Sequence, residues 1–409
     1  MDIRSVTLFC EAGAADAPLA HFLQAARHAF PYPVQSTRMA TPPFPDWWPQ
    51  PDATTVAHLA QQTAARGQAL GVDYISLGPV LLRHDPVWLN ALPVIFATSD
   101  ALFATAEIAD TSGNLDTGRC WHVADIIRRV STVSPNGFGN LYLAALANCP
   151  PGSPFFPVAY HQGGAPTFAI AVESADLALD AIQAAKTLPE ARANLVAAIE
   201  EEAGKVVNTA VSLAQEYNIP FHGIDFSLAP YPTDSKSLGG AMEALGLPHV
   251  GAAGSLFAAG FITEAIERAN FPRCGFSGLM LPVLEDSVLA RRAAAGVLTV
   301  QDLLSYSAVC GVGLDTIPLP GDISQDSLTA ILLDVAMLAT RLRKPLTARL
   351  MPLPGLQAGD PVTFDFAYFA DSRVMAVRGE TLQKHLRQSA HLTIEHVRQS
   401  KSQAVSSDE

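Results

Sequence analysis

One pattern occurs twice near the carboxyl end of the chain: an apolar run stops at Pro-Leu-Pro-Gly, and an aspartate follows. The first copy runs from residue 310 to Asp322 and the second from residue 348 to Asp360, and residues 324–343 between them have the period of one amphipathic helix. Proline fixes φ and glycine permits positive φ, so each copy ends a strand in a rigid loop. The sequence predicts a strand–helix–strand unit with polar groups at the carboxyl strand ends, where α/β proteins bind ligands.

Helix and strand signals alternate along most of the chain. Strand-like runs occur at residues 3–9, 74–80, 167–173 and 219–227, and helical periods at 17–30, 54–70, 86–91, 121–132, 237–245, 255–269, 286–295 and 300–309. The apolar run Val94–Ala97 is predicted to be a further strand. The helical period over 174–217 is interrupted at Pro189, and proline suits the first turn of a second helix. This alternation predicts the α/β fold class with a largely parallel sheet, and no linker forces a division into two domains.

Composition excludes several classes of protein. The chain has 409 residues, 49% of them hydrophobic, which is enough for a sizeable core. Its net charge of -13 argues against nucleic acid as the main partner, because phosphate binding needs a concentrated basic surface. The first residues do not resemble a signal peptide, and no apolar run reaches the roughly 20 residues of a membrane span. We expect a cytoplasmic protein with no membrane partner.

Several familiar chemical motifs are missing. The five cysteines are odd in number, widely spaced and without a Cys-x-x-Cys pair, so we expect reduced thiols rather than disulfides or a zinc site. No glycine-rich dinucleotide motif, Walker loop, nucleophile elbow or His-Glu-x-x-His occurs in a usable context, so no nucleotide cofactor is expected. Gly251–Ser255 before a helix is only a weak phosphate signal.

The segment 41–51 is rich in proline and contains the adjacent tryptophans Trp47 and Trp48. Exposed tryptophans are costly unless they cover something, so this segment is predicted to be a rigid flap or a contact in a homodimer.

Five stretches carry a resemblance to a known family; they are residues 154–161, 223–230, 278–286, 310–322 and 344–355. With them, the chain resembles the domain of unknown function 711 family, which is related to the UPF 0210 proteins. The resemblance implies the ten-stranded α/β barrel of the pyruvate formate-lyase-like glycyl radical enzymes. It implies one barrel domain at 1–379. The polar sequence beyond it predicts a carboxy-terminal helix with a frayed tail at 380–409.

The barrel does not carry the radical reaction with it. Glycyl radical enzymes keep their radical on a glycine in a carboxy-terminal Arg-Val-x-Gly-aromatic loop, whereas this chain reads Arg373-Val-Met-Ala376. Gly379 lacks the preceding pattern and the aromatic residue. Because alanine lacks the backbone freedom of glycine, a non-radical protein is predicted.

Asp225 and Asp315 are the leading catalytic candidates because each stands where an apolar run ends. A carboxylate there can act as general base, metal ligand or substrate anchor, although capping of the next helix or turn is the alternative. His161 follows an aromatic, proline-fixed segment that could aim its ring into a cleft, and a core histidine bonded to backbone is the rival interpretation.

Substrate binding is assigned to Arg349, Ser227 and Lys344. Arg349 could hold an anionic group with its bidentate fork, and Ser227 ends the same run as Asp225. For Lys344, a simple charge at a helix carboxy terminus is slightly favoured. Four weaker candidates complete the set: Glu285, Asp286, Cys310 and Asp322. Helix capping explains the three acids about as well, and a helix end raises rather than lowers the pKa of a cysteine.

Two functions follow as hypotheses. The first is an enzyme that acts on a small anionic metabolite by acid–base or metal-assisted hydrolysis or elimination; a divalent cation could serve it. The second is a small-molecule binding or regulatory protein without turnover. An enzyme should bring two or more of the ionisable candidates together in one pocket, whereas a binding protein needs only an anion contact and apolar walls.

Overall fold

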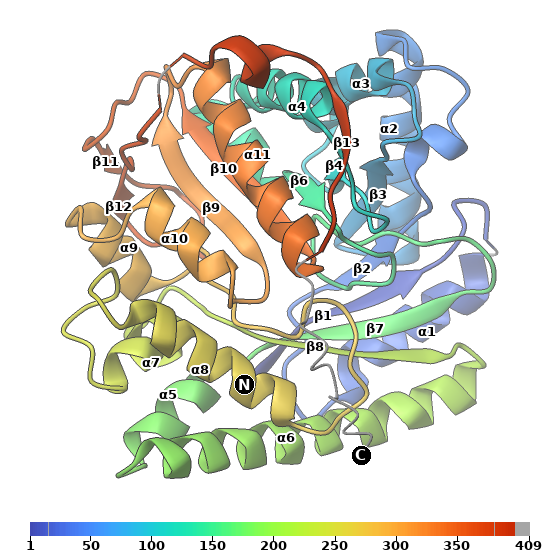
Figure 1. The fold of residues 1–409 in the computed structure, drawn as a ribbon. Coiled ribbons are helices and arrows are strands. Elements are labelled where there is room, and N and C mark those ends of the chain that lie inside the picture. Colours follow the sequence, from blue (N-terminus) through green and yellow to red (C-terminus); the bar gives the residue numbers. More distant parts are fainter. Residues whose placement is uncertain (15, 380, 397–409) are drawn as a thin grey trace, which may run out of the picture.

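A computed structural model describes residues 1–14, 16–379 and 381–396. Its centre is a strongly curved, 11-stranded sheet wrapped by helices (Figure 1). The main path runs β8-β7-β1-β2-β3-β4-β6-β10-β9. These strands are β1 (Asp2–Phe9), β2 (Thr37–Ala40), β3 (Tyr74–Val80), β4 (Leu102–Ala109), β6 (Leu143–Ala147), β7 (Thr167–Glu173), β8 (Phe221–Ala229), β9 (Gly313–Pro320) and β10 (Leu346–Leu353). The predicted α/β class is confirmed.

Strand direction divides the sheet into three groups. β1, β2, β3, β4 and β6 are parallel to one another, as are β7 and β8, and as are β9 and β10. The groups meet at two antiparallel pairs, β1 with β7 and β6 with β10. One end of the sheet therefore combines the amino ends of the first group with the carboxyl ends of the other two.

The helices bury apolar faces against the outside of the sheet and against each other. They are α1 (Asp16–Ala29), α2 (Ala53–Leu70), α3 (Ala91–Thr98), α4 (Thr117–Val130), α5 (Ala175–Gln183), α6 (Leu188–Tyr217), α7 (Leu238–Ala244), α8 (Ser255–Arg268), α9 (Ser287–Ala294), α10 (Val300–Ser307) and α11 (Gln325–Leu342). Pro189 stands in the first turn of α6, as predicted. The long α6 runs along the bottom of the molecule in Figure 1, packed on α5 and α8.

The repeated sequence pattern forms the predicted unit. β9 and β10 are parallel neighbours, α11 connects them, and each strand ends within its Pro-Leu-Pro-Gly. The two turns also pack together, because the Gly321 amide donates to the Leu356 carbonyl over 2.9 Å. A Cβ on Gly321 would lie 2.3 Å from the Leu353 carbonyl oxygen, so this close approach requires glycine.

Two secondary-structure predictions are wrong. Val94–Ala97 lies inside α3, and the strand comes later, as β4; a short apolar run fits a buried helix as well as a strand. The predicted carboxy-terminal α-helix is absent from residues 381–396, which form the short 3-10 helix η5 (Lys384–Arg387) and strand β13 (His391–Thr393) instead. β13 pairs with β5 (Asn114–Asp116), because that edge offers free backbone groups. The predicted frayed tail at 397–409 lies outside the described residues.

Smaller elements complete the fold. They are the 3-10 helices η1 (Phe44–Asp46), η2 (Pro86–Asn90), η3 (Pro135–Leu141) and η4 (Asp234–Lys236), and the two-stranded sheet of β11 (Pro361–Val362) and β12 (Ser372–Arg373). In the tryptophan segment, Trp48 is buried against Phe44, and Trp47 donates to the Pro42 carbonyl over 3.1 Å. Both tryptophans therefore make contacts within their own chain.

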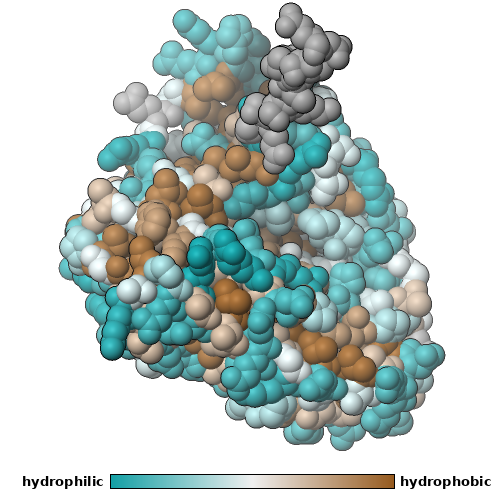
Figure 2. All heavy atoms as spheres, turned by 60° about the horizontal axis from the view of Figure 1, so that its bottom comes forward, coloured by the Kyte–Doolittle hydropathy of each residue, from teal (hydrophilic) through white to brown (hydrophobic). Residues whose placement is uncertain are grey.

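The surface around α6 and α8 mixes hydrophilic side chains with scattered hydrophobic ones (Figure 2). Leu256 and Phe257 of α8 are among the exposed apolar residues. In the part of the chain that the structure describes, no helix combines the length and apolar character needed to cross a membrane.

Candidate functional site

Two β-bulges occur at charged residues of the candidate site. In the β1–β7 pair, the register shifts at Arg4, which is an extra residue between Ile3 and Ser5. In the β9–β10 pair, Asp315 and Thr316 together face Arg349, and Thr316 takes the left-handed φ of 45°. Bulges redirect side chains and are common next to active sites.

Side chains at these bulges join Glu285 in a buried ionic network. Arg349 donates from Nε to Asp315 Oδ1 over 2.5 Å and from Nη2 to Glu285 Oε1 over 2.8 Å. Arg4 bonds the other oxygen of Glu285. Asp315 Oδ2 is buried and has no hydrogen-bond partner among the described residues. The order Arg4–Glu285–Arg349–Asp315 alternates in charge, which offsets the cost of burying each group.

Burial and neighbouring charges shift the pKa values of Glu285 and Asp315 in opposite directions. Burial alone would raise the pKa of the Glu285 carboxyl, but the positive charges of Arg4 and Arg349 outweigh it and hold the pKa below its ordinary value. Burial raises the pKa of Asp315, and the negative charge of Glu285 adds to this effect, while Arg349 opposes it. Glu285 therefore stays ionised, and Asp315 takes up a proton more readily than an ordinary aspartate.

A cavity of about 450 Å³ opens beside this network. Arg4, Glu285 and Arg349 line it, together with Arg38 from β2. Arg38 donates to Ser36 Oγ over 2.9 Å but has no carboxylate partner in the described residues. Burial lowers the pKa of Arg38 to about 10, and the nearby charge of Arg4 adds to the shift. The guanidinium is still positive at neutral pH.

Aromatic rings form the walls of the cavity. Arg38 lies 5.0 Å from the ring of Phe156 and 5.7 Å from that of Tyr74. Tyr74 then contacts Phe103, and Phe103 contacts Tyr142, at ring distances of 5.5 and 5.1 Å. The other aromatic lining residues are Phe138, Phe366 and Tyr368. Phe138 and Phe366 contact one another at 5.1 Å, so the loop between β11 and β12 packs against η3 beside the cavity.

The cavity lies at the end of the sheet where strands of opposite direction meet. Arg4, Arg38 and Tyr74 stand near the amino ends of their strands, whereas Arg349 comes from the middle of β10. From the sequence, ligand contacts were expected only at carboxyl strand ends. Arg349, Asp315 and Glu285 were therefore among the candidates, but the contributions from β1, β2 and β3 were not.

Asp225 and Ser227 lie apart from the cavity lining and hold a loop. The Asp225 carboxylate accepts from the amides of Phe276 and Ser277 over 2.9 and 3.0 Å, and from the Ser227 hydroxyl. Burial raises the pKa of Asp225, against the effect of these hydrogen bonds. The expected convergence of Asp225 with Asp315 and Arg349 is not seen: Arg349 lines the cavity, Asp315 lies behind it, and Asp225 contacts the 274–278 segment.

The remaining candidates have local partners or none. His161 is buried, and its Nε2 lies 3.4 Å from the Gly164 carbonyl oxygen. Lys344 donates to the carbonyls of Ala308 and Cys310 just past the end of α10, which is the expected charge at a helix carboxy terminus. Asp322 is exposed in the first Pro-Leu-Pro-Gly turn. None of these lines the cavity beside Arg349.

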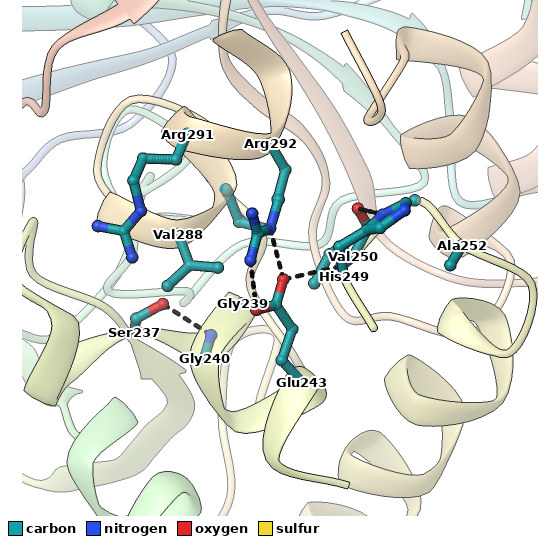
Figure 3. A network of polar contacts seen from close by, with 12 residues as sticks. Ser237, Gly239, Gly240, Glu243, His249, Val250, Ala252, Val288, Arg291 and Arg292 are labelled. Atoms are coloured by element: carbon teal, nitrogen blue, oxygen red, sulfur yellow. Dashed lines mark hydrogen bonds and ion pairs between the residues drawn. The ribbon is translucent and has the colours of Figure 1, made fainter. Parts of the chain in front are cut away.

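Asp286 caps two helices at once. Its carboxylate accepts from the amides of Leu238 and Gly239 at the start of α7, and from those of Val288 and Leu289 at the start of α9. Figure 3 shows the adjoining contacts, in which Ser237 Oγ accepts from the Gly240 amide and Arg292 of α9 pairs with Glu243 of α7. The hydrogen bonds of Asp286 fix the backbone next to Glu285.

Metal binding has no evident ligand set in the described chain. Across residues 1–14, 16–379 and 381–396, no three His, Cys, Asp or Glu side chains gather where they could hold an ion. The divalent cation considered from the sequence stays a prediction.

Comparison with known proteins shows the family. The family model described as Uncharacterised ACR (DUF711) matches residues 1–372. The chain belongs to the DUF711 family. This DUF711 protein is 35% identical over 327 residues to a UPF0210 protein of Pyrobaculum aerophilum, covering 76% of this chain and 71% of the relative. A UPF0210 protein of Neisseria meningitidis is 26% identical over 357 residues, covering 81% and 76%.

The resemblance stated from the sequence is thereby confirmed at the level of the family. The two arginines of the DUF711 protein that sequence reasoning missed are Arg4 and Arg38. Each is an arginine inside a short strand whose neighbours are otherwise mostly buried, in Ile-Arg-Ser-Val and Thr-Arg-Met-Ala. A charge in such a run is the signal that could have identified them.

Proposed function

We propose that the cavity binds a small anionic metabolite and that Arg38 is its anion contact. The observation that carries this proposal is the guanidinium of Arg38, which lines the cavity without a carboxylate partner in the described residues. Within the ionic network, Arg4 and Arg349 already form ion pairs with Glu285 and Asp315. Arg38 is thus an additional positive charge, and an anionic ligand would neutralise it in a site of restricted solvation.

The size and walls of the cavity support a small organic molecule. A volume of about 450 Å³ suits a ligand of metabolite size, and rings such as Tyr74, Phe103 and Phe156 provide apolar contact. Charged side chains combined with aromatic walls are the arrangement expected of a pocket for a small polar molecule.

Acid–base catalysis is a second candidate, and Asp315 favours it. Its raised pKa and its buried, unbonded Oδ2 suit a group that exchanges a proton. Glu285 lines the cavity and carries charge, so the two carboxylates could take different roles, as acids with separated pKa values do in many enzymes. This proposal uses no glycyl radical, in line with the prediction from the resemblance, which expects the radical glycine where the sequence has Ala376.

We further propose that the sheet closes into the ten-stranded barrel implied by the family resemblance. Residues 272–283 support this, because they bond to both edge strands. Cys274 donates to the Ile224 carbonyl of β8 over 3.0 Å, and Val283 donates to the Asp315 carbonyl of β9 over 3.1 Å. An experimentally determined structure would test the closure. A homodimer and a cytoplasmic location stay predictions; light scattering in solution tests the first.

The binding proposal is tested by calorimetry with small carboxylates and phosphates on the wild type and on Arg38→Met. A lost charged hydrogen bond should weaken binding by about 1.5–3 kcal/mol. Arg83→Met is the matched control, because Arg83 pairs with Asp46 on the surface and does not line the cavity. Equal affinities for wild type and Arg38→Met would contradict the proposal. Following the bound molecule by NMR over hours separates binding from turnover.

A further inference from the structure

Some acidic side chains around the cavity form ion pairs with arginines of the protein, and others have no such partner among the described residues. Asp73 pairs with Arg27 over 2.6 Å, and Glu285 pairs with two arginines. Asp100 and Asp365 also line the cavity, yet neither has an ion-pair partner among the described residues. Both are exposed residues, so they stand toward solvent, whereas the ionic network is buried.

A continuous aromatic wall connects the unpaired cation to one of these acids. Arg38 lies against Tyr74, Tyr74 contacts Phe103, and Phe103 contacts Tyr142. Asp100 comes just before β4, the strand that carries Phe103. Arg38, this row of rings and Asp100 all line the same cavity.

Asp365 approaches from the other wall. It precedes Phe366, and Phe366 contacts Phe138, whose ring lies 6.0 Å from that of Tyr142. Two unpaired carboxylates from separate segments, one before β4 and one between β11 and β12, thus line the same cavity as Tyr142. Rings with a negative face also favour a cation.

From this arrangement we infer that the ligand carries two opposite charges: a carboxylate or similar anion held by Arg38, and a cationic amine near Asp100 and Asp365, separated by an apolar or aromatic body. The inference rests on the proposed function for the Arg38 end and extends it to the Asp100 end. A ligand with only an anion would use Arg38 and leave both acids without a partner. An amine at the other end would gain an opposite charge and an aromatic contact.

Matched probes test the second charge alone. para-(Aminomethyl)benzoate and para-methylbenzoate share a ring and a carboxylate and differ in the amine; ε-aminocaproate and caproate form a flexible pair. Calorimetry on the full chain should show that the amine-bearing member of at least one pair binds roughly tenfold more tightly. The double variant Asp100→Asn/Asp365→Asn should reduce that advantage to about twofold or less, with the affinity for the simple carboxylate unchanged.

Asp322→Asn serves as the control, because Asp322 is an exposed aspartate outside the cavity. It should keep the full advantage of the amine. If the carboxylates bind through Arg38 but the amine brings no gain, or if the double variant keeps the gain, the two-charge ligand is overturned while the anion site stands. If no probe shows binding that depends on Arg38, both the anion site and the two-charge ligand fail.

Discussion

Arg349 reaches Asp315 over 2.5 Å at the point where two residues of β9 face one residue of β10. The bulge, the ion pair and the left-handed Thr316 therefore occupy one position in the sheet. Because Arg349 also bonds Glu285, this arginine holds the network together, whereas Asp315 makes its bond at one end of it.

The two partners should differ in their effect on stability. Arg349→Met leaves two buried carboxylates with one fewer cation, and losses of this kind cost about 3–5 kcal/mol. Asp315→Asn should cost less, because Arg349 keeps Glu285 and the amide can still accept its bond. Urea unfolding of both variants measures the difference. An Asp315→Asn loss equal to or above that of Arg349→Met would contradict this view of the network.

Asp225→Asn should destabilise the protein and leave ligand binding unchanged. The carboxylate accepts from the amides of Phe276 and Ser277, and an asparagine amide can satisfy only part of this arrangement. We expect a loss of about 1–3 kcal/mol by urea unfolding. The catalytic role considered for Asp225 from the sequence would instead give altered ligand binding with an intact fold, so thermal melts and calorimetry on this one variant distinguish the two roles.

Glu107 on β4 should make stability depend on pH. Burial raises the pKa of Glu107 to about 7 from an ordinary value of 4.5. Between these values the folded state holds a proton that the unfolded state has lost, so this contribution is complete below pH 4.5 and disappears as the pH rises through 7. Glu107→Gln should flatten that slope and stabilise the protein at pH 8 by about 2–3 kcal/mol. Glu201→Gln on the exposed face of α6 is the control.

Two glycine replacements should act in opposite directions. Gly321→Ala places a Cβ 2.3 Å from the Leu353 carbonyl oxygen, so we expect a loss of about 1–3 kcal/mol. Gly204→Ala lies inside α6 with nothing within 4 Å of the added Cβ, so it should stabilise by about 0.5–1 kcal/mol. Thermal unfolding of the pair tests the packing of the two Pro-Leu-Pro-Gly turns.

The features predicted correctly from the sequence are those that depend on residues close together in the chain. The unit of β9, α11 and β10 followed from proline, glycine and one helical period, and the capping alternative for Asp286 agrees with its hydrogen bonds. Val94–Ala97 was misassigned, because four apolar residues carry no period long enough to separate a helix from a strand.

The site could be predicted only in part. Arg349 and Asp315 were named because carboxyl strand ends were expected there, although the structure places Arg349 in the middle of β10 and Asp315 near the amino end of β9. Glu285 was among the weaker candidates. Arg4 and Arg38 were not found, since their place depends on strand direction and on a bulge in the β1–β7 pair. Neither property can be read from residues near them in the chain.

The pairing of Arg4 with Glu285 has a consequence for the order in which the molecule is made. The two residues are 281 positions apart, so a growing chain carries Arg4 in its first strand long before the acid that neutralises it has been synthesised. Residue 349 comes later still. The cavity therefore cannot be complete in any nascent chain or proteolytic fragment that stops short of β10, so its assembly depends on nearly the whole polypeptide.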